Sequence, residues 1–270
     1  MVVQHNMQAV NTNRMLGQNV KAVSKSSEKL SSGYKVNRAA DDAAGLSISE
    51  KMRNQIRGLN QAVKNSEDGI SLIQTAEGNM NEIHSILQRM GELAIKSRND
   101  VNATEDRATI QDEVAQLKLE ITSITNKAEF NGSKLLSGGF QAKLLQVGAN
   151  VGETMSISIS GTSLATLGIE NTTVSGGGSA SQAISQIQAA IKNVSAQRSK
   201  LGAIQNRLEY TINNLENYSE NLTSAESNIR DTDMATEMVN YSKNNILQQA
   251  AQSMLAQANQ SNQGVLSLLQ

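Results

Sequence analysis

The chain has 270 residues with 24 basic and 25 acidic side chains, and it contains no proline, cysteine or tryptophan. The balanced charge excludes a whole-protein basic field for nucleic acid, and the lack of cysteine excludes disulfide scaffolds, thiolate zinc sites and cysteine nucleophiles. Four tyrosines and two phenylalanines provide little aromatic bulk for a thick globular core, so thin helical packing is favoured.

The N-terminal segment, residues 1–44, is expected to be a helix with an apolar seam. Its apolar residues recur at helical spacing, although less regularly than in the rest of the chain. Neither an apolar stretch of a signal peptide nor a run of roughly 20 apolar residues for a membrane span is present, so we expect no membrane partner. The seam positions in this segment include Leu16, Val20, Val23 and Leu30.

Residues 45–130 predict two helices joined by a turn. From Met52 to Leu93 the apolar positions follow a 4–3 alternation, which predicts one amphipathic helix over about 45–98, roughly 80 Å long at 1.5 Å per residue. The turn-forming stretch NDVNATED interrupts this pattern, which restarts at Ile110. A second helix, about 105–129, should therefore fold back antiparallel on the first.

Residues 141–160 change to a period of two, with Met155, Ile157 and Ile159 alternating with serines. Because QAKLLQVG precedes them across a glycine-containing turn, the segment predicts a β-hairpin, the one sheet element expected. A Gly/Ser-rich loop around 171–180 follows. The capping-box pattern of Ser179 and Gln182 then predicts a helix over about 180–230.

The C-terminal segment, residues 231–270, combines an apolar seam with only four charged residues and 12 asparagines and glutamines. A helix of this composition can be buried on all sides if its amides find partners. The two terminal segments either pair only with each other, or need neighbouring copies to complete their packing and so build a helical filament. Its seam positions include Leu247, Ala251, Met254, Ala258, Val265 and Leu268.

No pattern in the chain indicates catalysis or a cofactor. His84 has no metal-binding partner one turn away, and GGG at 176–178 lacks the lysine of a phosphate loop. The pair Asp41–Asp42 suggests a carboxylate site, but an acidic cluster at a helix N-terminus is the better interpretation. We therefore expect a protein that is not an enzyme and that binds no metal.

Four strings resemble the signatures of bacterial flagellin. They are LSSGYKVNRAADDAAGLSISEKMR (30–53), QRMGELAIKSRN (88–99), AEFNGSKLL (128–136) and the segment from SNIRDTDMATEMV to VLSLL (227–269). The resemblance implies a mainly α fold, a long antiparallel helical coiled-coil bundle with a small β-hairpin. Residues 1–44 and 231–270 would pair as an inner coiled-coil domain, residues 45–230 would form a rod domain, and the variable outer domains of longer flagellins would be missing.

That resemblance also implies a function and partners. The chain would polymerise with itself into the extracellular bacterial flagellar filament for motility, after export through the flagellum's own channel. It would meet an export chaperone at its C-terminal segment and the filament cap and hook-junction proteins at assembly. Two alternatives stay open: a hook–filament junction protein and a secreted coiled-coil effector.

The resemblance further implies recognition by vertebrate Toll-like receptor 5 through Gln88, Arg89, Leu93 and Glu113. Arg89 and Leu93 are four residues apart and share a helix face, where an arginine beside an apolar anchor is typical of a binding hot spot. Gly91 stands where many flagellins have an arginine, which removes a possible contact. An equally weighted alternative makes Arg89 and Glu113 salt-bridge residues between subunits.

Overall fold

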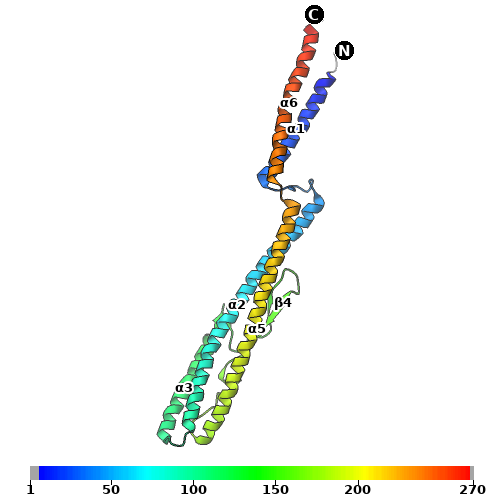
Figure 1. Cartoon of the computed structure of the whole chain (residues 1–270). Coiled ribbons are helices and arrows are strands. Elements are labelled where there is room, and N and C mark those ends of the chain that lie inside the picture. Colours follow the sequence, from blue (N-terminus) through cyan, green and yellow to red (C-terminus); the bar gives the residue numbers. More distant parts are fainter. Residues whose placement is uncertain (1–5, 268–270) are drawn as a thin grey trace. The chain divides into compact units, whose positions relative to one another are not determined.

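The computed structural model describes residues 6–267, and its side chains through residue 261. The elements in chain order are α1 (Met7–Ser32), α2 (Ala43–Arg98), α3 (Thr104–Lys127), β1 (Glu129–Phe130), β2 (Ser133–Lys134), β3 (Lys143–Gln146), β4 (Thr154–Ile157), α4 (Leu164–Leu167), α5 (Gly177–Arg230) and α6 (Met234–Ser267) (Figure 1). The predicted mainly α fold, with long helices and a small hairpin, is confirmed.

The chain forms two compact units. We call residues 55–220 the central unit, and residues 1–54 with 221–270 the terminal unit. The terminal unit is thus assembled from both ends of the chain.

The core of the central unit lies between α2, α3 and α5. The apolar residues that predicted these helices supply it, because a 4–3 spacing places them on one side of each helix. Each fully buried aliphatic side chain contributes about 1.5–3 kcal/mol relative to exposure. On these three helices the largest fully buried side chains are Ile73, Met80, Ile83, Leu87, Met90, Ile121, Ile187 and Leu201, all less than 2% exposed.

The β3–β4 hairpin covers part of this core, as its alternation predicts. The strands are antiparallel, with Leu145 opposite Met155, and Met155 and Ile157 are buried. A second hairpin, β1–β2, was not predicted, because strands of two residues carry no detectable period. Its turn residues Asn131 and Gly132 have φ angles of 48° and 75°, which suit the Asn-Gly turn of a tight hairpin.

The segment before α5 is more ordered than the predicted loop. Lys118 donates to the carbonyl oxygens of Glu170 (3.0 Å) and Thr172 (2.5 Å), and Gln111 accepts from the Val174 backbone N–H at 2.6 Å. Val174 is fully buried. Helix α5 begins at Gly177, three residues before the predicted start at about residue 180.

In the terminal unit, α1 and α6 lie side by side and antiparallel (blue and red in Figure 1). Asn6 caps α1 by accepting from the Ala9 backbone N–H at 3.0 Å, and its Nδ2 donates to the Ala258 carbonyl of α6 at 3.0 Å. At the other end of the pair, Gly33 ends α1 with φ 76°. A left-handed residue here is typical of a glycine helix terminus.

Candidate assembly site

Helices α1 and α6 meet along a seam of small and medium-sized side chains. On α1 the seam holds Leu16, Val23 and Leu30, all half-buried. On α6 it holds Ala251 and Ala258, the latter 4% exposed. Because few side chains of this seam are fully buried, the pair alone contributes little of the burial that stabilises a fold.

Three of the other predicted seam residues are exposed. Val20 is 43% exposed, Leu247 42% and Met254 55%. In the single chain Leu247 and Met254 thus lie outside the seam with α1, because the half-buried positions of α6 follow a different register. That register holds Tyr241, Asn244, Gln248 and Leu255 beside the two alanines. The role of Leu247 and Met254 as filament-core assembly residues stays a prediction. The side chain of Val265 and the whole of Leu268 lie outside the described residues.

The outward sides of the two helices carry further large apolar residues. A contiguous apolar surface on a soluble protein marks an interaction site. Those on α6 lie on more than one side of the helix, so one neighbour could not cover them all. The residues are Met7, Val10 and Met15 on α1 and Met234, Met238, Val239 and Ile246 on α6, each at least 45% exposed.

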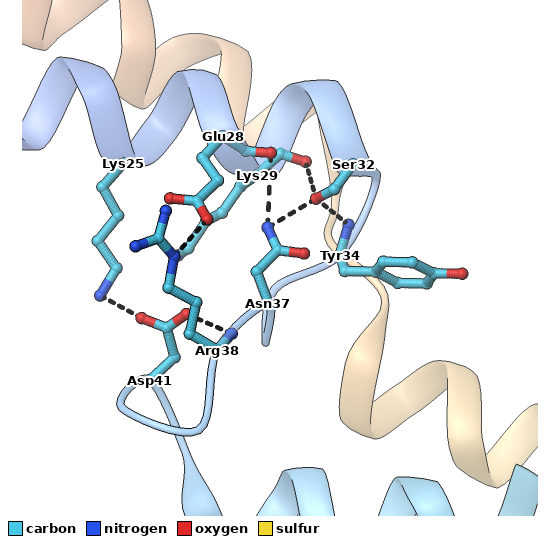
Figure 2. Close-up of polar contacts among 8 residues, drawn as sticks. All are labelled: Lys25, Glu28, Lys29, Ser32, Tyr34, Asn37, Arg38 and Asp41. Atoms are coloured by element: carbon cyan, nitrogen blue, oxygen red, sulfur yellow. Dashed lines mark hydrogen bonds and ion pairs between the residues drawn. The ribbon is translucent and has the colours of Figure 1, made fainter.

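The connector, residues 33–42, is tied to α1 by ion pairs and hydrogen bonds (Figure 2). Asp41 accepts from Lys25 Nζ at 2.8 Å, and the Arg38 Nε donates to Glu28 Oε1 at 2.8 Å. Asn37 Nδ2 donates to Ser32 Oγ at 2.7 Å. The hydrogen bond from Lys25 holds the pKa of Asp41 below its ordinary value.

The connector also contacts the chain between α5 and α6. The Lys35 backbone N–H donates to the Arg230 carbonyl at 2.7 Å, and Thr232 donates to the Gly33 carbonyl at 3.0 Å. The Arg230 guanidinium lies 4.5 Å from the centre of the Tyr34 ring, a cation–π distance. These contacts hold the connector between α1 and α2 beside residues 231–233, which separate α5 from α6.

The helices that follow these two segments, α2 and α6, are each capped at the N-terminus by an aspartate. Asp42 accepts from the Gly45 backbone N–H at 2.9 Å, which confirms the helix N-terminal interpretation for this residue. A Cβ on Gly45 would lie 2.4 Å from Asp42 Oδ2, so glycine makes room for the cap. Asp233 caps α6 through the Ala235 backbone N–H at 2.9 Å and the Thr236 hydroxyl at 2.8 Å.

The predicted receptor-contacting residues lie on α2 and α3 of the central unit. Arg89 donates from Nε (3.0 Å) and Nη2 (2.9 Å) to Glu113 Oε1, and from Nη1 to Glu92 at 3.2 Å. Its pKa is raised, chiefly by the hydrogen bond to Glu113. Arg89 and Glu113 therefore pair within one chain. A pair between subunits was one of the two equally weighted predictions for these residues and stays a prediction.

Leu93 and Gln88 occupy different environments. Leu93 is 2% exposed and belongs to the core, so the expectation of an apolar anchor beside Arg89 on the surface is wrong. Gln88 is exposed, and its Nε2 lies 3.1 Å from His84 Nε2. The exposed part of this surface is thus polar, made of Gln88, Arg89 and Glu113.

Among the residues that the structure describes, no three His, Asp or Glu side chains gather as a possible metal site. No helix in that part of the chain is both long and apolar enough to cross a bilayer.

Comparison with known proteins decides the family. The family profile of the bacterial flagellin N-terminal helical region matches residues 3–141, and that of the bacterial flagellin C-terminal helical region matches residues 184–269. A flagellin of Halalkalibacterium halodurans is 52% identical over the full length of both chains. The chain belongs to the flagellin family. The Bacillus subtilis flagellin is 48% identical and the flagellar filament 31.3 kDa core protein of Treponema maltophilum 45% identical, each over the full length of both chains.

Solved structures of this type agree with the flagellin fold. The crystal structure of Bacillus cereus flagellin has a TM-score of 0.52 at 28% identity, covering 56% of this chain and 88% of that chain. A structure described as a flagellar hook-associated protein from Vibrio parahaemolyticus has a TM-score of 0.60 and covers 71% of this flagellin and 100% of that chain. At 13% identity, the latter shows a likeness of fold alone.

Proposed function

We propose that this flagellin is a structural subunit, not an enzyme, which polymerises into the extracellular bacterial flagellar filament for motility. The observation that carries the proposal is the α1–α6 pair, whose outward sides expose large apolar residues such as Val239, Ile246 and Met254. Residues 1–44 and 231–270 form the inner coiled-coil domain of the filament, and residues 45–230 form its rod domain.

Polymerisation would cover these exposed apolar residues. A second copy that covers one side of α6 leaves another side exposed, so the contact must repeat. A contact between different surfaces of identical copies forms a closed ring if the rotation between copies closes, and an open helical polymer if it does not. The full-length flagellin relatives favour the open polymer here. The full-length similarity to flagellins favours this subunit over a hook–filament junction protein or a secreted effector.

The test is seeded polymerisation of the purified chain, followed by electron microscopy. Long helical filaments are the expected result. Short capped oligomers would favour the junction protein, and persistent monomers would favour the effector. The double variant Leu247→Gln/Met254→Gln should lose polymerisation, because it makes an outward side of α6 polar. Val101→Thr, at a residue that is 89% exposed in the central unit, is the matched control and should still polymerise.

Before assembly, the same apolar residues of α6 need cover. An exposed apolar surface of this kind promotes aggregation, so an export chaperone that binds the C-terminal segment fits the monomer. The filament cap and hook-junction proteins are the further partners of the growing polymer. Titration of the monomer with the chaperone should show binding that Leu247→Gln/Met254→Gln weakens.

A second proposal concerns vertebrate Toll-like receptor 5. The favouring observation is that Arg89, with its side chain 53% exposed, is held beside Glu113 and Gln88 on one surface. Leu93 supports this surface from the core. Arg89→Ala should weaken binding of the monomer to the receptor ectodomain without loss of helix content. Lys200→Ala, an exposed change on α5, is the control, and equal affinities for both variants would remove Arg89 from the site.

A further inference from the structure

One side of α1 is basic. Arg14, Lys21 and Lys25 follow at spacings of seven and four residues, which places them on the same side of the helix, and all three are exposed. Leu16, Val23 and Leu30 occupy the roughly opposite side and face α6. The basic side of α1 therefore points away from its partner helix.

The parts of α1 and α6 that lie beside the basic side contain no carboxylate of their own. Residues 6–25 of α1 and residues 238–261 of α6 contain Arg14, Lys21, Lys25 and Lys243 but no aspartate or glutamate. Of these four cations, only Lys25 has a carboxylate within 4.0 Å in the part of the chain that the structure describes, that of the connector residue Asp41. Two cations of the basic side, Arg14 and Lys21, are left without an ion-pair partner among the described residues.

Carboxylates without a cation lie at the opposite end of the same helix pair. Asp231 and Asp233 are exposed where α6 begins, and neither has a basic group within 4.0 Å in the described part of the chain. The Thr232–Gly33 hydrogen bond places them at the level where α1 ends. From there, Lys21 is 12 residues and Arg14 is 19 residues back along α1, or roughly 18–29 Å at 1.5 Å per residue.

We propose that Arg14 and Lys21 of one copy form ion pairs with Asp231 and Asp233 of the next copy in the polymer, a contact that requires parallel copies staggered by roughly 20–30 Å along the α1–α6 pair. The stagger brings Arg14 and Lys21 of one copy beside Asp231 and Asp233 of the next. The inference deepens the proposed function and rests on it, because it concerns how the copies contact each other.

The alternatives are electrostatically or geometrically unfavourable. Parallel copies in register leave Arg14 and Lys21 roughly 18–29 Å from the level of the neighbour's Asp231 and Asp233, so the opposite charges do not meet. Antiparallel copies match the charges, but that contact is its own reciprocal and closes a dimer, which cannot grow. A parallel stagger matches the charges and repeats indefinitely.

Charge reversal tests the contact. Lys21→Glu and Asp231→Lys should each raise the critical concentration for polymerisation, by about fivefold for a favourable surface ion pair. The combination Lys21→Glu/Asp231→Lys should restore it, because the pair is re-formed with opposite polarity. Lys51→Glu, an exposed change on α2 of the terminal unit, is the control. Additive defects in the double variant would overturn the proposal.

Disulfide cross-linking tests the stagger, because the natural chain has no cysteine. The two cysteines are placed next to the charged residues: Gln18→Cys lies one turn from Lys21, and Met234→Cys follows Asp233. Within one chain, residue 18 lies about 15 residues of α1, or roughly 22 Å, from the end of α1 beside which residue 234 lies. A disulfide needs Cα atoms within about 7 Å, so no bond can form inside the chain.

Oxidised filaments of the Gln18→Cys/Met234→Cys variant should give a ladder of covalent multimers, and neither single variant should. Dimers of the Gln18→Cys single variant would show copies in register and overturn the stagger. Dimers alone from the double variant would show the closed antiparallel pair. Failure of the unmodified chain to polymerise would instead refute the proposed function.

Discussion

At the scale of single residues, carboxylates decide where the helices of the terminal unit begin. The first backbone N–H groups of any helix lack partners within it, and an aspartate at the N-terminus accepts from them while its charge interacts favourably with the helix dipole. Asp42 has this role for α2 and Asp233 for α6. The acidic pair Asp41–Asp42 ahead of a helical stretch allowed the first of these helix N-termini to be predicted.

Asp233 should make the start of α6 sensitive to acid. The hydrogen bond from the Thr236 hydroxyl is the main cause that holds its pKa below the ordinary value of 3.8. A lowered folded-state pKa means that the cap contributes fully above the unfolded-state pKa and is lost as the pH falls through the folded-state pKa. Hydrogen exchange at Ala235 and Thr236 should therefore accelerate below that pH.

Asp233→Asn is the matched variant for this experiment, since asparagine also caps helices but does not titrate in this range. Its exchange at the same two amides should show no acid transition. A carboxyl titration that places the pKa of Asp233 at or above 3.8 would contradict the expected stabilisation.

At the scale of elements, long periodic segments were predictable and short ones were not. The helices at 43–98, 104–127 and 177–230 begin and end within three residues of their predicted limits. A helix of many turns repeats its apolar signal, whereas β1–β2 and α4 are held by turn geometry and by contacts with distant residues. The spacing of apolar residues also did not show which residues of α6 face α1. In the structure Asn244 and Gln248 are half-buried, whereas Leu247 and Met254 are exposed.

Two glycines of α2 should respond oppositely to alanine. A Cβ on Gly58 would lie 2.9 Å from the Cβ and 3.3 Å from the Cα of Ala149 at the tip of the β3–β4 hairpin, whereas Gly78 has no atom within 4 Å. Gly78→Ala should stabilise the central unit by up to about 1 kcal/mol through helix propensity. Gly58→Ala should be about 1–3 kcal/mol less stable than Gly78→Ala, because the hairpin must move.

Urea denaturation of the two variants measures this difference, with near-ultraviolet circular dichroism reporting on the tyrosines. Equal gains in the free energy of unfolding would show that the hairpin tip does not pack against α2 at Gly58. The comparison isolates packing, because both changes add the same methyl group to the same helix.

At the scale of the whole molecule, the two units differ in how they obtain their stability. The core cluster of the central unit draws all its residues from the range Ile73–Leu208 and is closed within one chain. In the terminal unit, large apolar residues of both helices stay exposed. The apolar periodicity at the two chain ends predicted a pair, but only a structure could show which residues the pair leaves uncovered.

A chain that ends at residue 230 should separate these two sources of stability. It keeps the whole core cluster of the central unit, so cooperative urea unfolding of that unit should persist with nearly unchanged free energy.

The shortened chain lacks α6, and α1 then has no partner for Leu16, Val23 and Leu30. Because an isolated helix of 26 residues with this lightly apolar seam is marginal in water, α1 should lose most of its helicity. Far-ultraviolet circular dichroism should thus fall by more than the loss of the 34 residues of α6, and seeded solutions should form no filaments. Filament growth by this shortened chain would show that α6 is dispensable and would refute the assembly role of the terminal pair.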